Sequence, residues 1–416
     1  MRDRDYDVVL HGAGGFTGRQ TVEYFARHAP AGLRWAVAGS SRARLEGALA
    51  AAAAPHVDAL VADSRDPSSV DAVVRRTRVL LSTAGPFARW GTPVVDACVR
   101  FGTHHVDITG ETPWVRELVA RYHDRAAAEG TRIVPCCGFD SVPSDLGAFL
   151  VARHAQRTLG ASCAEVRAYF RLKGGLNGGT LASLYQMMES GSWTAMRDRF
   201  LLDPPDARHD REIVRRSRDL ARPERDEWID AWVAPFVMAG VNSRVVRRSA
   251  ALFAAWGEPY GDAFVYREAQ RFGRGTGGRL GAWLLTAALG AFLGLVRRRP
   301  TRALVASLLP KPGSGPSERT MDEGGFTCDL VGVTQDGRRV RGRIRHRGDP
   351  GNRATVRFVC EAALALALEL ERLPGGPARG GVLTPATAFG DVLVARLRAA
   401  GVEIGVGDQA AREGIS

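Results

Sequence analysis

The feature that most constrains this chain lies near its start, where residues 8–18 read VVLHGAGGFTG. The leading apolar residues suit a strand that is buried on both faces. Gly12, Gly15 and Gly18 then follow at regular spacing, with Gly14 as an extra glycine. This spacing lets the backbone turn sharply, approach a diphosphate closely and pack the next helix on the strand. The segment therefore predicts the first strand, loop and helix of a dinucleotide-binding fold.

A helix over residues 17–27 fits the pattern that follows. The first N–H groups of a helix lack partners inside it, and together with the helix dipole they attract an anion. We therefore expect the loop to bind the diphosphate of a nucleotide coenzyme; the alternative is a glycine-rich turn without a ligand. The residues assigned to this site are Gly12, Gly14, Gly15, Phe16, Thr17 and Gly18.

The end of the second predicted strand, residues 33–39, indicates which coenzyme is bound. An NAD site needs a carboxylate there to hold the ribose 2′-hydroxyl. The sequence instead places Ser40, Ser41 and Arg42 at this point, with Arg44 close behind. Because an arginine pairs with a 2′-phosphate, these residues favour NADP(H). The alternative is that Arg42 and Arg44 belong to the solvated first turn of the next helix.

Strands and helices alternate through the first third of the chain. Further strands are expected at 57–62, 79–84, 104–108 and 131–136, and helices at 42–54, 67–76, 92–101 and 113–129. This alternation predicts an α/β fold with a doubly wound parallel sheet.

Ligands bind beyond the carboxyl ends of the strands in such a sheet. We therefore assign to the cofactor the residues after the third and fourth strands. These are Asp63, Ala84, Gly85, Pro86 and Phe87. Together with Gly85 and Pro86, residues after the fifth and sixth strands are candidate walls of the nicotinamide pocket. These are Gly110, Glu111, Gly138, Phe139 and Asp140.

The charge balance narrows the class of partner. The net charge is +12, and Lys173 and Lys311 are the only lysines in an arginine-rich chain. Aromatic residues do not interleave with the basic ones as they do in nucleic-acid sites, so we expect no nucleic-acid partner. A positive surface still suits an acidic carrier protein or an anionic lipid.

Cysteine usage and the start of the chain both favour the cytosol. The six cysteines include no C-x-x-C pair, so we expect reduced thiols. The initial MRDRD is charged and runs directly into the first strand, so we expect no cleaved signal peptide.

An uncharged segment, residues 280–296 (LGAWLLTAALGAFLGLV), is followed at once by Arg297, Arg298 and Arg299. A membrane span needs about 20 apolar residues, so this run is at the short limit. Three interpretations stay open: a helix buried in the second domain, a peripheral anchor over 280–299 at the inner face of the plasma membrane, and a lining for an apolar substrate. A single span is disfavoured because it would divide the second domain.

The rest of the chain has less regular patterns. We expect a hairpin between 326–333 and 338–345 across Asp336-Gly337, and a helix that starts at Thr384-Pro385. Other expected elements are helices at 144–159, 180–190 and 353–373, strands at 166–172 and 263–267, a charged surface excursion at 203–227 and a loop at 311–316.

Several stretches resemble saccharopine dehydrogenase-like oxidoreductases, and most closely the actinobacterial trans-acting enoyl reductases. They are GAGGFTG (12–18), STAGPF (82–87), HHVDITGE (104–111), CGFDSVPSDLG (137–147), GGT-AS (178–183), RGDPG (347–351) and GGVLTPATAFGDVLVARLRAAG (380–401). These stretches span nearly the whole chain, and those at 137–147 and 380–401 are quite specific.

The resemblance implies a domain organisation that fits a chain of 416 residues. It implies an NADP-binding Rossmann domain at 1–140 and a second α/β domain with a mostly antiparallel sheet at 141–379. A C-terminal helix and tail at 380–416 would then belong to the cofactor-side architecture. A homodimer is expected as the commonest oligomer.

The resemblance also implies a reaction, the reduction by NADPH of a carbon–carbon double bond in an acyl or polyketide lipid held by a polyketide synthase, in wax and glycolipid biosynthesis. Such a reduction needs a donor that stabilises the enolate and an acid that protonates the α-carbon. Asp140 and Ser141, after the sixth strand, are candidates, and helix capping is their alternative role. Lys173 and Tyr185 are candidates from the second domain, with a solvated face and core packing as alternatives.

Metal chemistry is not expected. His104, His105, Asp107 and Glu111 have a spacing that could hold a metal, but no second ligand cluster accompanies them. Three functional classes therefore remain: an NADPH-dependent enoyl reductase, a saccharopine-type reductase of a C=N or C=O bond, and a cofactor-binding protein of lipid surfaces with little turnover.

Overall fold

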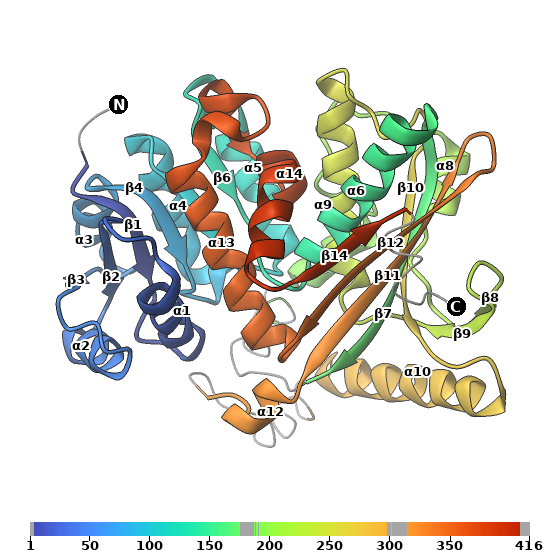
Figure 1. Cartoon of the computed structure of the whole chain (residues 1–416), viewed down its shortest axis with the longest axis horizontal. Helices are drawn as coiled ribbons and strands as arrows, with labels where there is room; N and C mark the ends of the chain where they lie inside the picture. Colours follow the sequence, from blue (N-terminus) through green and yellow to red (C-terminus); the bar gives the residue numbers. More distant parts are fainter. Residues whose placement is uncertain are drawn as a thin grey trace.

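Two sheets of strands lie side by side and helices cover them (Figure 1). The computed structural model describes residues 4–174, 187, 189, 191–297, 301 and 314–407. The expected helix at 180–190 lies almost wholly outside these residues, and the expected loop at 311–316 lies partly outside them.

Sheet A is parallel throughout, in the order β13-β6-β5-β4-β1-β2-β3. Its strands are β1 (Tyr6–His11), β2 (Trp35–Gly39), β3 (Asp58–Val61), β4 (Thr77–Ser82), β5 (His104–Asp107), β6 (Arg132–Val134) and β13 (Gly381–Val382). The predicted doubly wound parallel sheet is therefore confirmed. The strand that closes its β6 edge comes from far along the chain.

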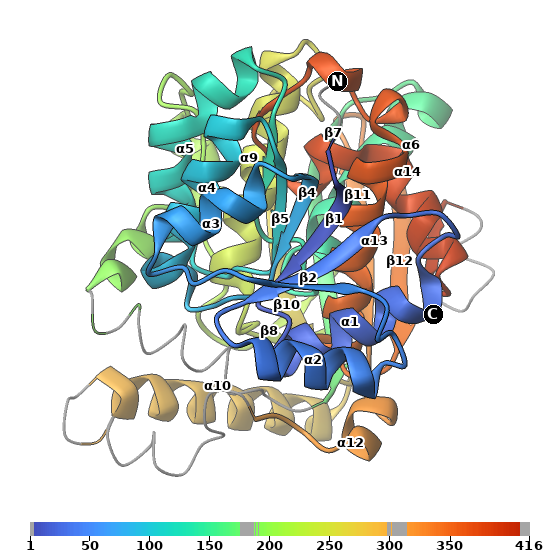
Figure 2. The same ribbon diagram turned by 90° about the vertical axis from the view of Figure 1, so that its left-hand side faces the viewer.

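Helices cover both faces of sheet A (Figure 2). Alternate residues of β1 point to opposite faces, so Val8 and Leu10 join one buried cluster and Val9 joins another. The first face is covered by α1 (Phe16–His28), α2 (Arg42–Ala51) and α13 (Thr355–Leu368). The second is covered by α3 (Pro67–Val74), α4 (Phe87–Phe101) and α5 (Thr112–Ala128).

Sheet B is mostly antiparallel, in the order β14-β12-β11-β7-β10-β9-β8, with β7 and β10 as its parallel pair. Its strands are β7 (Cys163–Lys173), β8 (Glu224–Asp226), β9 (Ala231–Ala234), β10 (Val265–Arg271), β11 (Gly325–Thr334), β12 (Arg339–Arg347) and β14 (Glu403–Val406). The helices α6 (Val142–Leu159) and α9 (Ala239–Ala255) pack on one face. The implied mostly antiparallel second sheet is thus confirmed.

Local signals located several elements of this half well. The expected hairpin forms, because Val333 pairs with Arg339 across a turn in which Gly337 takes a φ of 85°. The helix α14 (Pro385–Ala399) begins as predicted, and the Thr384 side chain accepts a hydrogen bond from the Thr387 N–H.

Other elements differ from the sequence prediction. The helix α13 ends at Leu368, five residues before the predicted end, and β10 lies at Val265–Arg271 where we expected 263–267. The segment 203–227 contains the short helix α8 (Arg211–Arg216) and β8. Five further α-helices and strands of the described residues were not predicted: β9, α9, α12 (Glu318–Asp322), β13 and β14.

The elements of each sheet layer do not come from single ranges among the three expected domains, 1–140, 141–379 and 380–416. The helix α13 packs on sheet A although it lies within 141–379, and of the C-terminal strands β13 joins sheet A while β14 joins sheet B. All six cysteines are buried and unpaired, as expected for reduced thiols.

Two buried arginines attach distant segments to the β6 edge of sheet A. Arg132, on β6, donates to the carbonyls of Pro374 (2.8 Å) and Gly376 (2.7 Å). Arg248, on α9, donates to the Val382 carbonyl of β13 at 2.6 Å. Burial lowers the pKa of each arginine to about 10, so both stay charged at neutral pH.

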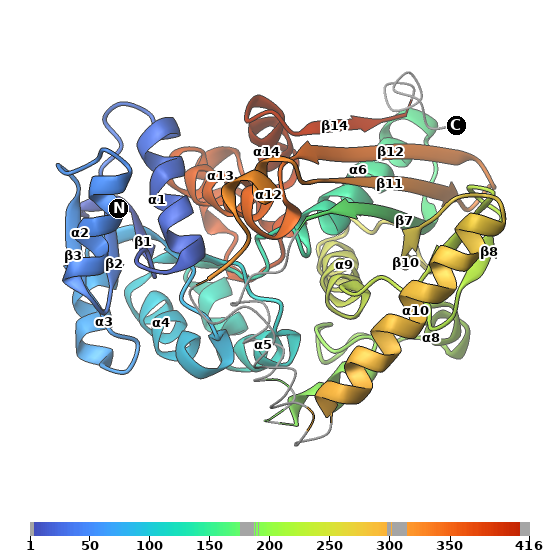
Figure 3. The ribbon, with the colours of Figure 1, turned by 90° about the horizontal axis from the view of Figure 1, so that it is seen from below.

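The uncharged segment forms α10 (Thr276–Arg297), which lies along the outside of sheet B and contacts β9 (Figure 3). Leu280 and Leu284 are 60% and 61% exposed, so the buried-helix interpretation is wrong for the single chain. Within the described residues, α10 is the one helix long and apolar enough to cross a membrane, which by itself is weak evidence of a span.

We predict opposite effects of alanine at two helical glycines. A Cβ at Gly18 would lie 2.1 Å from the Gly12 carbonyl oxygen, whereas a Cβ at Gly47, on α2, would meet no atom within 4 Å. Gly18→Ala should lower the free energy of unfolding by about 1–3 kcal/mol because the loop must shift. Gly47→Ala should raise it by about 0.5–1 kcal/mol. Urea unfolding monitored by circular dichroism measures both, and equal effects would contradict the packing described for Gly18.

Candidate functional site

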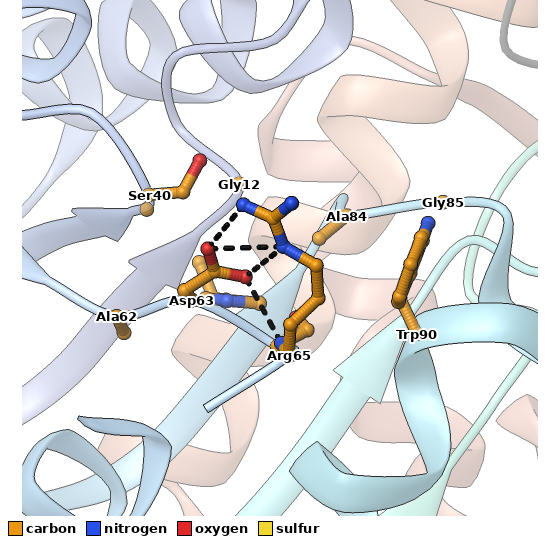
Figure 4. Close-up of a pocket in the computed structure, with 11 residues that line it drawn as sticks. Gly12, Ser40, Ala62, Asp63, Arg65, Ala84, Gly85 and Trp90 are labelled. Atoms are coloured by element: carbon orange, nitrogen blue, oxygen red, sulfur yellow. Dashed lines mark hydrogen bonds and ion pairs between the residues drawn. The ribbon is translucent and has the colours of Figure 1, made fainter. Parts of the chain in front are cut away.

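A cleft of about 280 Å³ opens at the carboxyl ends of β1, β2, β3 and β4 (Figure 4). Five of the predicted cofactor residues line it. They are Gly12, Ser40, Asp63, Ala84 and Gly85. Since the residues after four neighbouring strands meet here, the cleft lies where a parallel α/β sheet binds its ligand.

The glycine loop has the close packing that a diphosphate site needs. Gly12 takes a φ of 84°, and a Cβ there would lie 2.9 Å from the Ala84 nitrogen. Gly15 is the N-cap of α1, and as a glycine it has no side chain that could cap the helix. The first turn of α1 thus keeps N–H groups for an anion. These features fit a nucleotide diphosphate.

The remaining loop residues hold the loop against its surroundings. Gly14 lies against Arg44, whose Cβ would be 3.0 Å from a Cβ on Gly14. The ring of Phe16 packs against Gly315, which lies in the segment that leads to sheet B. Thr17 belongs to the first turn of α1. Phe16 is therefore a contact between the loop and the second half of the chain.

The end of β2 carries the residues assigned to a 2′-phosphate. Ser40 lines the cleft, and Ser41 is the N-cap of α2 without a side-chain capping bond. Arg42 has a side chain 61% exposed, and its guanidinium lies 3.8 Å from the Glu46 carboxylate. Such an exposed pair is worth little, so Arg42 can turn to a phosphate at small cost.

Arg65 is a cleft residue that the sequence analysis missed. It follows β3 and donates through Nε to Asp63 Oδ1 at 3.0 Å and through a terminal nitrogen to Oδ2 at 2.6 Å (Figure 4). This paired guanidinium lowers the pKa of Asp63 to about 2. Asp63 is therefore a carboxylate already paired with a cation. The signal available in the sequence was the position of Arg65, just beyond the end of a strand.

Five further lining residues were also missed: His11, Gly39, Ala62, Ser64 and Trp90. His11 ends β1, and burial lowers its pKa to about 4, so it is neutral at neutral pH. Its Nδ1 lies 3.3 Å from the Ser82 hydroxyl of β4. Trp90, on α4, lines another side of the cleft (Figure 4). Neither His11 nor Trp90 belongs to a sequence motif that would predict cofactor binding.

Glu111 has a different role from the one predicted. Its buried carboxylate accepts hydrogen bonds from the backbone N–H groups of Phe87 and Ala88, each at 2.9 Å. It therefore holds the N-terminus of α4, where an anion is favoured by unpaired N–H groups and the helix dipole. Pro86 is the N-cap of α4, and the Phe87 ring packs in the core, 5.8 Å from the Trp114 ring. The Phe87 ring therefore belongs to the core, and its backbone N–H bonds Glu111.

The histidines and carboxylates suspected of metal binding serve the structure instead. Asp107 is fully buried and accepts from the Thr109 N–H at 2.9 Å, and it lies 3.0 Å from His105 Nε2. His104 Nδ1 accepts from the backbone N–H of Arg132 at 3.0 Å. The part of the chain that the structure describes holds no group of His, Cys, Asp or Glu suited to a metal ion.

Asp140 stands at the same edge of sheet A, beyond the end of β6. Burial raises the pKa of its carboxyl group to about 6. A Cβ on Gly110 would be 3.8 Å from Asp140 Oδ2, so this carboxyl lies beside the residues that follow β5. The cleft, Gly110 and Asp140 therefore follow one another along the strand ends of β1, β4, β5 and β6.

Ser141 is the N-cap residue of α6, but its side chain does not cap that helix. The buried hydroxyl donates to Asn242 Oδ1 on α9 at 3.3 Å, and the Asn242 amide donates to Glu268 Oε1 on β10 at 2.9 Å. Ser144 donates to Glu268 Oε2 at 2.8 Å, and Tyr266 does so at the same distance. The alternative role of Ser141, capping of α6, is therefore wrong for its side chain, which instead joins a network that links α6 to sheet B.

The two candidates from the second half of the chain have different outcomes. Lys173 is exposed at the end of β7, and no described contact joins its side chain to Asp140. Tyr185 lies outside the described residues. Gly138 and Phe139 are structural: Gly138 packs against Thr355, and the Phe139 ring lies 4.7 Å from the Phe326 ring.

Comparison with known proteins agrees with this geometry. Residues 8–134 match the family described as the saccharopine dehydrogenase NADP binding domain. A trans-acting enoyl reductase of Mycobacterium tuberculosis is 36% identical over 97% of this chain and 98% of its own length. Another protein of that organism, provisionally given the same activity, is 38% identical over 96% of this chain and 97% of its own. The structure of apo saccharopine dehydrogenase (L-Glu forming) from Saccharomyces cerevisiae aligns over 96% of this chain and 99% of that one, with 14% identity and a TM-score of 0.49.

We predict that Arg42 sets the preference for NADP(H). Arg42→Glu should weaken NADPH binding by about tenfold to 100-fold and leave NADH binding nearly unchanged, because it removes a cation from the 2′-phosphate. Fluorescence titration with both coenzymes measures the ratio. Arg27→Glu, the same change at an exposed arginine in the last turn of α1, is the matched control. An unaltered NADPH-to-NADH ratio in Arg42→Glu would count against the assignment.

Proposed function

Because this chain belongs to the family of the trans-acting enoyl reductases, we propose that it reduces the double bond of an α,β-unsaturated acyl thioester. The chain is an NADP-dependent oxidoreductase, as its coenzyme-binding domain and its relatives indicate. The observation that carries the proposed reaction is the half-buried Asp140, whose raised pKa lets a carboxyl group keep its proton at the edge of sheet A where the cleft opens.

The coenzyme would be held by the glycine loop at its diphosphate and by Ser40 and Arg42 at the 2′-phosphate. When bound, NADPH supplies the hydride that an enoyl group accepts at its β-carbon. The double-bond electrons then move toward the thioester oxygen, and the α-carbon becomes basic. Reduction is completed when an acid gives this carbon a proton.

Asp140 is suited to be that acid. Desolvation favours the neutral carboxyl group, and its pKa of about 6 keeps a useful fraction protonated near neutral pH. After the proton is transferred, the carboxylate can be reprotonated by solvent because the residue is only half-buried. Ser141 acts here as a positioning residue, since its hydroxyl is bonded to Asn242 and fixes the turn that carries Asp140.

The substrate we propose is an acyl or polyketide lipid chain attached to an acyl carrier protein. The name of the relatives describes enzymes that act in trans, which requires that the reductase meet its substrate on another protein. The net charge of +12 supports an encounter with an acidic carrier, because opposite charges speed association. Lipid biosynthesis, including that of glycolipids, is the pathway class in which we place this reaction.

The reaction can be tested with purified full-length protein. We predict that an enoyl thioester stimulates NADPH oxidation, followed as the loss of absorbance at about 340 nm. An aldehyde mixed with an amino acid, which forms an imine, should give no stimulation. The saturated thioester should appear in equimolar amount with NADP⁺ by mass spectrometry. Turnover of the imine mixture alone would support the saccharopine-type alternative and contradict the proposal.

Asp140 can be tested by its pH dependence. Asp140→Asn should lower kcat by about 100-fold and leave the Kd for NADPH unchanged, because the amide cannot give up a proton. In the unchanged enzyme, kcat should fall as the pH rises through about 6, since the acid loses its proton, and the variant should lack this limb. Asp391→Asn, at an exposed carboxylate of α14, is the control. A variant that keeps the full rate and the same pH profile would exclude Asp140 as the acid.

A further inference from the structure

The outward face of α10 is apolar along nearly its whole length. The large exposed side chains on this face, with their exposed fractions, are Leu280 (60%), Trp283 (48%), Leu284 (61%) and Leu295 (45%). A helix on the surface of a globular protein normally turns such residues inward and polar residues outward. Contiguous apolar surface of this kind marks an interaction site.

The opposite side of α10 is held by sheet B. Ala282 is fully buried, and a Cβ on Gly281 would lie 3.0 Å from the ring of Phe272. Near the start of the helix, the Arg279 guanidinium lies 5.5 Å from the centre of the Trp232 ring on β9. The helix therefore lies flat along the surface (Figure 3), and crossing a bilayer would require these contacts to break.

The charges that flank this face distinguish between a second copy of the chain and a lipid bilayer as its partner. The sequence from 276 to 302 contains no Asp or Glu, and it places Arg279 before the apolar run and Arg297, Arg298 and Arg299 after it. A second copy that packed α10 against α10 would bring these arginines together in either orientation without a carboxylate from the helix to pair with them. An anionic bilayer offers what the face lacks, since it presents an apolar interior beneath negative headgroups.

We propose that α10 docks this protein on the surface of an anionic lipid bilayer, with the helix lying in the plane of the interface. The leucines and Trp283 enter the boundary between headgroups and acyl chains, and the positive charge that flanks the apolar run in the sequence attracts lipid phosphates. A tryptophan in this position is favoured because its ring is apolar and its indole N–H can reach the headgroups. The proposal does not depend on the reaction, because binding needs no turnover.

The experiment is co-sedimentation of the full-length protein with vesicles. We expect binding to vesicles of phosphatidylglycerol and phosphatidylcholine, and much weaker binding to phosphatidylcholine alone. Leu284→Ser should weaken binding by about tenfold or more, because a buried leucine contributes much of the apolar attraction. The matched control is Leu368→Ser, at a leucine 46% exposed at the end of α13, which should bind as the unchanged protein does.

A second variant tests the electrostatic half of the proposal. Replacing Arg297, Arg298 and Arg299 by glutamine should reduce binding to the anionic vesicles by about 100-fold, while coenzyme binding stays the same. Equal loss in Leu284→Ser and Leu368→Ser, or binding that ignores lipid charge, would overturn the proposal. So would light scattering that shows a dimer dissociated by Leu284→Ser, because the face would then be covered by a second copy. Coenzyme titration of each variant confirms that it is folded.

Discussion

Buried guanidinium groups that donate to main-chain carbonyls hold the distant parts of this chain together. Arg132 and Arg248 bond the segment 374–388 to the edge of sheet A and to α9. Arg244 and Arg247, also on α9, bond the carbonyls of Met196, Arg199 and Ser217. A buried cation is costly unless its hydrogen bonds are satisfied, and loop carbonyls that lack partners need donors. The terminal nitrogens of these arginines supply donors to such carbonyls, although the buried Nε atoms of Arg132, Arg247 and Arg248 have no hydrogen-bond partner among the described residues. The bonds that do form fix the positions of segments around both sheets.

This arrangement places the proposed acid. Asp140 follows β6, the strand that Arg132 ties to the C-terminal segment, and the next residue is bonded to Asn242 of the arginine-rich helix α9. Glu268, on β10, receives the amide of Asn242 and the hydroxyls of Ser144 and Tyr266. The turn between β6 and α6 is therefore fixed from sheet B as well as from sheet A. Asp140 lies in this fixed turn, where burial of its carboxyl group raises the pKa.

The coenzyme half of the fold could be predicted because its signals are local. Buried parallel strands read as short apolar runs, and the glycines at 12, 15 and 18 form a motif that is visible within one short segment of sequence. The helix α9 was missed because Arg244, Arg247 and Arg248 stand on its buried side, where a periodicity argument expects apolar residues. The strands β13 and β14 are too short to show alternation.

The site was predictable to the extent that it follows strand ends. Five cleft residues could be named because the residues after β1 to β4 converge in any such sheet. Arg65, His11 and Trp90 could not, because side-chain direction within a loop or on a helix depends on packing that the sequence does not display. Glu111 was predicted to line the pocket for a similar reason, its place after a strand. Its carboxylate instead accepts hydrogen bonds from the first N–H groups of α4.

The late position of β13 has a consequence for how the protein matures. This strand is formed by residues 381 and 382, yet it pairs with β6, which precedes it by almost 250 positions. On the ribosome the coenzyme-binding half would emerge early and wait, with one sheet edge open, until nearly all of the second half had been made. Completion of the nucleotide-binding sheet thus requires that six of the seven strands of sheet B have already been synthesised.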